Sequence, residues 1–181
     1  QNLDIVQRHD PDYILVLGGD HIYTMDYSKM LVEHVNAGAD FTVGCIEVPI
    51  EEAKGFGVMA VDQNHRITEF TEKPKHPREI PNKPGMALAS MGIYIFSKDF
   101  LYKVLYEDAM KLHSSRDFGK AIIPSNIHRA KAIAYPFRNE AGNPGYWRDV
   151  GTVYSYWQAN MELCSVKPEL NLYDRDWPIW T

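Results

Sequence analysis

A chain of 181 residues is long enough for one domain with a sizeable core, and 45% hydrophobic and 24% charged residues are ordinary for a soluble globular protein. The formal net charge is −5 and no basic stretch is long enough to follow a nucleic-acid backbone, so we expect no nucleic-acid partner. No apolar run approaches the roughly 20 residues of a membrane span and no signal peptide is visible, so we expect no membrane partner and a cytoplasmic location.

The first predicted elements are the end of a helix over residues 3–9 and an apolar strand over residues 13–17. The run Tyr-Ile-Leu-Val-Leu in that strand is typical of a strand buried on both faces. Gly-Gly-Asp follows, so the chain leaves the sheet abruptly and presents Asp20 at the carboxyl end of the strand, where open α/β sheets bind ligands. Asp20 is therefore a candidate ligand for a divalent cation, and the alternative that it caps a following helix is equally open.

A helix over residues 27–35, a strand over 41–48 and a β-hairpin over 55–71 come next. The strand, helix, strand order is the βαβ pattern of a sheet with covered faces. Gly57 lies inside the first hairpin strand, where glycine weakens the strand unless something must approach its backbone closely. Gly57 is thus either a ligand contact or the position of a bulge.

Glu72-Lys73-Pro74 closes the hairpin. Proline biases Lys73 toward an extended conformation, a lysine is a mobile point charge suited to one phosphate, and Glu72 has acceptors for sugar hydroxyls. From this motif alone a solvated strand end is the favoured interpretation. Ser90 lies inside a buried strand over residues 88–96, where its hydroxyl needs a partner from either backbone or ligand.

The second half predicts a helix after Ser97, a helix capped by Asp117, and a short strand over residues 132–137. A short aromatic strand then ends at Asp149, and Thr152 begins a helix. The packed face of that last helix is predicted to carry Val153, Trp157, Met161 and Cys164.

Asp20 and Asp149 form the candidate catalytic pair. Each follows an apolar strand and precedes a predicted helix, so we expect both at the same edge of the sheet. Two carboxylates so close repel unless a cation lies between them, and Mg²⁺ suits one or two carboxylates together with substrate phosphates. The alternative is two independent acids at helix starts.

Other common sites are not indicated by the sequence. The histidines form no zinc-ligand spacing, and His21 and His34 are interpreted as packed or surface residues. Cys45 and Cys164 are far apart, which favours free thiols in a reducing compartment. No nucleophile elbow, P-loop or dinucleotide fingerprint is present.

Seven segments, in order and across essentially the whole chain, resemble the bacterial ADP-glucose pyrophosphorylase (glucose-1-phosphate adenylyltransferase) family. Each segment is weak alone, and the ordered set is specific. Gly18 stands where the family usually has alanine. The segments are residues 17–23, 56–58, 70–74, 89–94, 117–120, 146–152 and 173–179.

The resemblance implies an α/β fold with a Rossmann-like mixed sheet of the nucleotide-diphospho-sugar transferase type, incomplete at the N-terminus. It implies adenylyl transfer from ATP to α-D-glucose 1-phosphate, giving ADP-glucose and pyrophosphate in the first committed step of glycogen synthesis. The alternatives are a related transferase that uses UTP, dTTP or GTP, and a non-catalytic regulatory subunit. The implied cofactor is Mg²⁺, the implied partners are ATP and glucose 1-phosphate, and the implied assembly is a homotetramer.

The resemblance also implies residue roles. Asp20 and Asp149 would hold the catalytic Mg²⁺, and Lys73 would bind the phosphate of glucose 1-phosphate. Arg8 falls where such enzymes place an arginine near the regulatory nucleotide site. The residues implied to bind the sugar phosphate are Gly57, Glu72, Lys73 and Ser90.

The family's glycine-rich nucleotide loop and left-handed β-helix domain have no counterpart in this sequence, which opens on Gln1. We therefore expect a piece of a longer protein. Residues 1–165 would be the C-terminal part of the nucleotidyltransferase catalytic domain, and residues 166–181 a linker toward the β-helix domain. Alone, such a piece is expected to be inactive.

Overall fold

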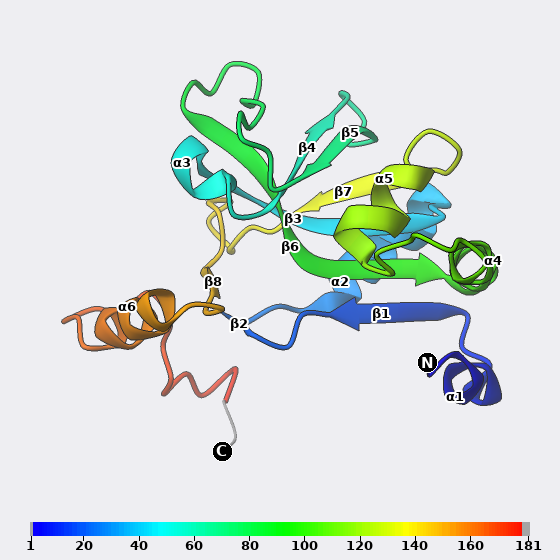
Figure 1. Ribbon diagram of the computed structural model, residues 1–181. Coiled ribbons are helices and arrows are strands. Elements are labelled where there is room, and N and C mark those ends of the chain that lie inside the picture. The colour runs from blue at the N-terminus through cyan, green and yellow to red at the C-terminus, as the bar shows by residue number, and fades with distance from the viewer. Residues whose placement is uncertain (1, 179–181) are drawn as a thin grey trace. The chain divides into compact units, whose positions relative to one another are not determined.

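The computed structural model describes residues 2–178, which fold as two compact units (Figure 1). Of the described residues, the first unit comprises 2–17 and 27–137, and the second comprises 18–26 and 138–178. Gln1 and the end of the predicted linker, residues 179–181, lie outside the described residues, as does the last residue of the family-like segment 173–179.

A six-stranded mixed sheet is the centre of the first unit, which confirms the predicted α/β class. The strand order is β5-β4-β6-β3-β7, and β1 pairs with β6. β3 and β7 run parallel, whereas the other pairs are antiparallel. The strands are β1 (Tyr13–Leu17), β3 (Phe41–Pro49), β4 (Gly57–Val61), β5 (Ile67–Glu72), β6 (Met86–Ser97) and β7 (Ala132–Pro136).

Helices connect these strands, and the hairpin of β4 and β5 forms as predicted. Gly38, with φ +56°, ends the second helix in the left-handed conformation that glycine adopts readily. A π-helical turn, η1, follows the fourth helix. The bounds are α1 (Leu3–His9), α2 (Tyr27–Ala37), α3 (Ile50–Ala53), α4 (Lys98–Ala109), η1 (Phe118–Ile122) and α5 (Ile123–Asn126).

The long strand β6 changes neighbours along its length. Residues 88–89 pair with β4 and residues 93–97 pair with β1, whereas β3 pairs with both halves, through residues 86–90 and 93–96. Between these halves Gly92 has φ +68° and the β3 register shifts. The register shift lies next to Ser90, and such irregularities are common beside functional sites.

The core of the first unit lies between the sheet and the helices that follow β6. Phe41 and Phe96 stack with ring centroids 5.7 Å apart, and both are fully buried. Burying such side chains supplies the main stabilisation, about 1.5–3 kcal/mol each. His34 is packed rather than exposed, since its ring nitrogens lie 2.8 Å from Thr42 Oγ1 and 3.0 Å from Ser97 Oγ.

Strand β1 differs from its prediction. Tyr13, Leu15 and Leu17 remain 38–44% exposed, so the expectation of burial on both faces is wrong for the described residues. An apolar sequence makes a strand suitable for burial, but whether the strand is buried depends on the elements that cover its faces. Among the described residues β1 is paired with β6 alone.

The described part of the second unit contains two short strands and one helix. β2 (His21–Tyr23) pairs antiparallel with β8 (Trp147–Asp149), and α6 (Val153–Leu163) follows. Thr152 caps α6 as predicted, in a reciprocal capping box with Ser155. The predicted packed face is wrong, because Ala159 is the buried residue of this helix and all four residues predicted for that face are exposed: Val153, Trp157, Met161 and Cys164.

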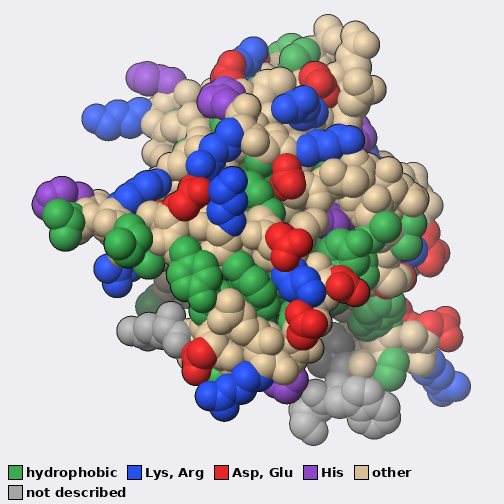
Figure 2. Space-filling view, turned by 90° about the vertical axis from the view of Figure 1, so that its right-hand side faces the viewer, with side chains coloured by type: hydrophobic (Ala, Val, Ile, Leu, Met, Phe, Trp, Pro, Cys, Tyr) green, Lys and Arg blue, Asp and Glu red, His purple; other side chains and the backbone are tan. Residues whose placement is uncertain are grey.

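Charged side chains are distributed over the surface in both signs. On the face drawn in Figure 2, basic and acidic side chains are interspersed, in keeping with the formal net charge of −5. Within residues 2–178, no helix combines the length and the apolar character that crossing a bilayer requires.

Candidate functional site

The pairing of β2 with β8 brings the predicted acid pair together in the second unit. His21 is opposite Asp149 in the antiparallel register, and the backbone N–H of Val150 donates to the backbone oxygen of Asp20 at 3.1 Å. One ligand atom from each of Asp20, His21 and Asp149 lies within 4.8 Å of the others. After Asp20 the chain enters a strand and not a helix, so the alternative of a helix cap at Asp20 is wrong.

Backbone geometry keeps space beside these carboxylates. The N–H of Gly151 donates to Asp149 Oδ1 at 2.8 Å. A methyl group at position 151 would lie 3.0 Å from Asp149 Oδ1 and 3.3 Å from Asp20 Oδ2, so glycine leaves both acids accessible. Two carboxylates this close, that of Asp20 exposed and that of Asp149 half-buried, offer the oxygen donors that Mg²⁺ prefers, and the residues therefore fit a divalent cation.

His21 is the residue of this site that sequence reasoning missed. Its side chain is only 10% exposed, and its Nε2 lies 3.4 Å from Asp20 Oδ1. The ring meets the Trp147 ring edge-on at 5.1 Å, and a methyl group at Gly18 would lie 2.6 Å from the ring's Cε1. Adjacency to Asp20 was visible in the sequence, but burial of the imidazole was not.

A polar cluster on α6 holds the strand that carries Asp149. The guanidinium Nε of Arg148 donates to both oxygens of Glu162, at 2.9 and 3.1 Å, and the Tyr146 hydroxyl donates to Glu162 at 3.0 Å. The Arg148 guanidinium also lies 4.6 Å from the Tyr146 ring centre. Burial and the bond with Glu162 raise the pKa of Tyr146 to about 12, so its hydroxyl stays a donor.

A second cluster lies in the first unit around Glu72. Gly57 is opposite Glu72 in the β4–β5 hairpin. A methyl group would lie 2.9 Å from Glu72 Oε2 if placed at Gly57 and 2.6 Å from it if placed at Gly119, so the carboxylate sits close to two glycines. The register irregularity of β4 falls between Ala60 and Val61, so the bulge alternative for Gly57 is wrong.

Several polar groups surround the Glu72 carboxylate. Burial, and then the negative charge of Asp117, raise the pKa of Glu72, whereas Lys73 and Lys120 act to lower it. Burial raises the pKa of Tyr94, against the opposing effect of its hydrogen bond with Ser90.

The Ser90 hydroxyl also accepts from the N–H of Gly92 at 3.3 Å, so both protein backbone and a side chain satisfy it. The predicted residues Gly57, Glu72, Lys73 and Ser90 therefore belong to one neighbourhood. The members that sequence reasoning missed are Tyr94, Asp117, Gly119 and Lys120.

Lys73 adopts an unexpected backbone conformation. Its φ is +46°, in the left-handed region, so the predicted extended conformation is wrong. The N–H of Lys73 donates to the backbone oxygen of Phe56 at 2.9 Å, which ties the turn to the start of β4. A non-glycine residue held at positive φ is uncommon, and such strain is concentrated at functional sites.

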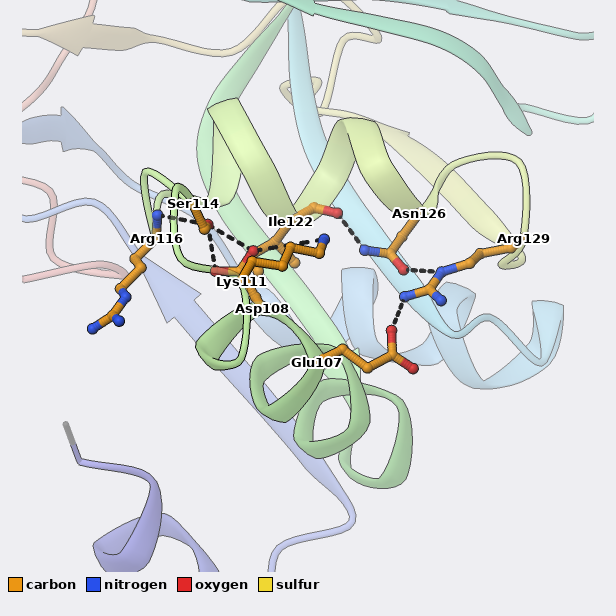
Figure 3. Close-up of polar contacts among 8 residues, drawn as sticks. All are labelled: Glu107, Asp108, Lys111, Ser114, Arg116, Ile122, Asn126 and Arg129. Carbon is orange, nitrogen blue, oxygen red and sulfur yellow. Dashed lines mark hydrogen bonds and ion pairs between the residues drawn. The ribbon is translucent and has the colours of Figure 1, made fainter.

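The segment that leads to Asp117 is fixed by the hydrogen bonds shown in Figure 3. The buried carboxylate of Asp108 accepts from the Ser114 hydroxyl at 2.7 Å, and the N–H of Arg116 donates to the same hydroxyl at 3.0 Å. Asp117 then caps η1 by accepting from the N–H of Lys120 at 2.8 Å. The position of Asp117 is therefore fixed by hydrogen bonds in the segment before it and by its own bond to Lys120 after it, although Asp117 itself is exposed.

Arg8 lies on α1, where its guanidinium is 3.8 Å from Asp4 one turn earlier. Both side chains are largely exposed, and such surface pairs contribute little stability. An allosteric role for Arg8 stays a prediction.

The sequence resembles known proteins along its whole length. A model of the nucleotidyl transferase family matches residues 1–166. Proteins named glucose-1-phosphate adenylyltransferase match all of this chain at 66% identity in Thiobacillus denitrificans, 65% in Hydrogenovibrio crunogenus and 60% in Nitrosococcus oceani. These matches confirm the resemblance found from the seven segments.

The chain covers 41% of the Thiobacillus protein and 43% of the other two, so it spans about two fifths of the length of these relatives. The family match covers more than half of the chain, and the mixed α/β sheet is consistent with the family fold. The chain therefore belongs to the nucleotidyl transferase family.

Proposed function

We propose that the protein transfers the adenylyl group of ATP to α-D-glucose 1-phosphate, forming ADP-glucose and releasing pyrophosphate. A phosphate oxygen of glucose 1-phosphate attacks the α-phosphorus of ATP, and the bond to the leaving pyrophosphate breaks in line. The observation that carries the proposal is the convergence of Asp20 and Asp149, in a chain at least 60% identical to three proteins named glucose-1-phosphate adenylyltransferase. The product would supply glycogen synthesis.

Asp20 and Asp149 are the residues that would hold Mg²⁺. The fit rests on two accessible carboxylates beside the unsubstituted backbone of Gly151. When bound, the ion neutralises negative charge on the phosphates. The carboxylates serve catalysis by fixing the ion's position, since phosphoryl transfer depends mainly on positioning and electrostatic stabilisation.

The Glu72 cluster is the part of the protein that would bind the sugar phosphate. Lys73, exposed and fixed at positive φ, would place one positive charge on the phosphate of glucose 1-phosphate. Glu72 and Ser90, with the backbone at Gly57, would line the sugar pocket. Because burial and Asp117 disfavour ionised Glu72, hydroxyl donors from a sugar would stabilise its charged form.

Three further features belong to the same proposal. Arg8 would lie near a regulatory nucleotide site, the protein would assemble as a homotetramer, and it would act in the cytoplasm. Residues 1–165 would form the C-terminal part of the catalytic domain, and residues 166–181 would lead toward a β-helix domain.

Substrate choice tests the proposal directly. The protein at its full natural length is incubated with glucose 1-phosphate, Mg²⁺ and ATP, UTP, dTTP or GTP in turn, and the sugar nucleotide is identified by mass spectrometry. We expect ADP-glucose as the main product. A preference for another nucleotide would show a related transferase, and absence of product with all four would show a non-catalytic subunit.

Variants test the roles of the acid pair and of Lys73 separately. Asp20→Asn or Asp149→Asn should lower turnover at saturating substrate by about 10²–10³-fold, the cost of losing one electrostatic contact with the transition state. Lys73→Ala should chiefly raise the KM for glucose 1-phosphate, with Lys75→Ala as the exposed control. Near-normal turnover in both Asp variants, or an unchanged KM in Lys73→Ala, contradicts the respective role.

A further inference from the structure

We propose that His21 is a third metal ligand, so that the site in the second unit offers one imidazole nitrogen together with the carboxylates of Asp20 and Asp149. This inference rests on the proposed metal site but concerns a residue to which the proposed function gives no task. It also changes the expected metal preference of the site.

The first support is the spacing of the three donors. Their ligand atoms lie within 4.8 Å of one another, and His21 Nε2 is 3.4 Å from Asp20 Oδ1. Ligands bound to one ion at about 2.0–2.2 Å are separated by roughly 3–4.4 Å, so small side-chain movements close this set on an ion.

The second support is the position of the His21 ring. Nine tenths of the side chain is buried, and Nδ1 has no hydrogen-bond partner among the described residues. Buried polar groups are ordinarily hydrogen-bonded. The nitrogen nearest the acid pair is Nε2, at 3.4 Å from Asp20 Oδ1, so Nε2 would be the ligand atom and the unpartnered Nδ1 would stay free of the metal.

A simple hydrogen bond explains the contact less well. The Nε2 to Oδ1 distance of 3.4 Å is longer than the usual 2.9–3.0 Å of an N–H···O bond. A ring that served only to hold Asp20 would be expected to approach more closely, as the backbone N–H of Gly151 approaches Asp149 at 2.8 Å.

Packing fixes the ring where the proposal needs it. The Trp147 ring lies against one side, with 5.1 Å between the ring centres. Gly18 also borders the ring, and a methyl group there would lie 2.6 Å from Cε1 of His21, so any larger residue would crowd the imidazole. The orientation of His21 therefore depends on the absence of a side chain at position 18.

A nitrogen ligand changes which ions the site favours. Mg²⁺ prefers oxygen donors, whereas imidazole favours transition metals, with affinity rising from Mn²⁺ to Co²⁺. Two carboxylates alone would distinguish these ions weakly. With His21 in the donor set, Co²⁺ should bind more tightly than Mg²⁺ by a margin that depends on the imidazole.

The test measures the metal and not only the reaction. Mn²⁺ is bound to the purified protein and pulsed electron paramagnetic resonance is used to detect coupling to a directly bound nitrogen. We expect this coupling in the wild type and in the exposed-histidine control His76→Gln, and its loss in His21→Gln. Isothermal titration should show Co²⁺ affinity about 10–100-fold weaker in His21→Gln, with Mg²⁺ affinity changed only a few-fold.

A second variant tests whether the position of the imidazole matters, and not only its presence. Gly18→Ala keeps His21 but displaces its ring, so the nitrogen coupling should also disappear, with folding checked by circular dichroism. If the wild type shows no nitrogen coupling, or if His21→Gln leaves the coupling and the ratio of Co²⁺ to Mg²⁺ affinity unchanged, the inference is wrong. If neither Asp20→Asn nor Asp149→Asn weakens metal binding, the proposed metal site itself is wrong.

Discussion

The two clusters are built differently. The Glu72 cluster belongs to strands of a six-stranded sheet and to the adjoining turn η1, and Phe70, two residues from Glu72, is part of the buried core. The acid pair depends on two strands of three residues each, because Asp149 ends β8 and Asp20 directly precedes β2. The positions of these strands depend on side-chain and backbone hydrogen bonds such as those to Glu162. Losing one polar contact should displace residues held by a large core less than residues held by two short paired strands, which are only marginally stable alone.

This difference indicates where each cluster is vulnerable. The Glu72 cluster should respond to changes in volume, because close-packed interiors tolerate added atoms poorly. The acid pair should respond to the loss of single polar groups, even ones that never touch a substrate. The following predictions test that contrast, beginning with the largest effect expected on stability.

Gly57→Ala should lower the free energy of unfolding by about 1–3 kcal/mol, the usual cost of overpacking a core. The added methyl group would lie 2.4 Å from Cζ of Phe70 and 2.9 Å from Glu72 Oε2. Urea denaturation measures the change. The matched control is Gly19→Ala in the second unit, because no atom lies within 4 Å of a methyl group at that position. Equal losses in both variants would contradict the role of packing at Gly57.

Glu162→Ala should lower the free energy of unfolding by about 1–2 kcal/mol, since it leaves the Arg148 guanidinium and the Tyr146 hydroxyl without their shared acceptor. The larger consequence should be a weaker metal site, because Arg148 adjoins Asp149 on β8. Calorimetric titration of Mn²⁺ measures this effect.

Glu162→Gln keeps an oxygen acceptor and should recover most of the metal affinity. Glu140→Ala, at an exposed acid of the same unit, is the control for net charge. Metal affinity that is unchanged in Glu162→Ala despite the lost stability would show that β8 holds Asp149 without help from α6.

The sequence allowed prediction of much of this architecture. Hydrophobic runs and turn residues located the strands of the first unit, the β4–β5 hairpin and the Thr152 cap, because these features depend on local patterns, whereas the mixed sheet was implied by the family resemblance. The convergence of Asp20 with Asp149 was also predicted, since both follow apolar strands, although the link between them proved to be an antiparallel strand pair.

The failures have physical causes that local patterns do not contain. Proline after Lys73 favours an extended backbone, yet a hydrogen bond to Phe56 accompanies φ +46°. Apolar spacing in α6 suggested a packed face, but the salt bridge between Arg148 and Glu162 tethers another side of the helix to β8. His21 was interpreted as a packed or surface residue, and its ring is indeed packed against Trp147, but sequence spacing did not show that the ring lies beside Asp20.

The smallest predicted effect is the contribution of Glu72 to the pH dependence of the free energy of unfolding. Burial and Asp117 raise its pKa, so the folded chain binds this proton more tightly than the unfolded chain does. Ionised Glu72 therefore destabilises the fold, and stability falls as pH rises from roughly 4.3, where an unfolded glutamate titrates, through the raised pKa. Glu72→Gln removes that dependence and should be more stable than wild type at pH 7 by less than about 1 kcal/mol, because Glu72 is only partly buried.

Urea titrations of wild type and Glu72→Gln at pH 4 and pH 7 measure this difference, with Glu79→Gln as the exposed control. The gain should be small at pH 4, where both forms of residue 72 are largely neutral, and larger at pH 7. If Glu72 also accepts hydrogen bonds from the sugar, the same variant should bind glucose 1-phosphate more weakly while being more stable. A stabilised variant with unchanged binding would separate the two roles, and would leave the partly buried carboxylate as a cost to folding with no compensating contact to the substrate.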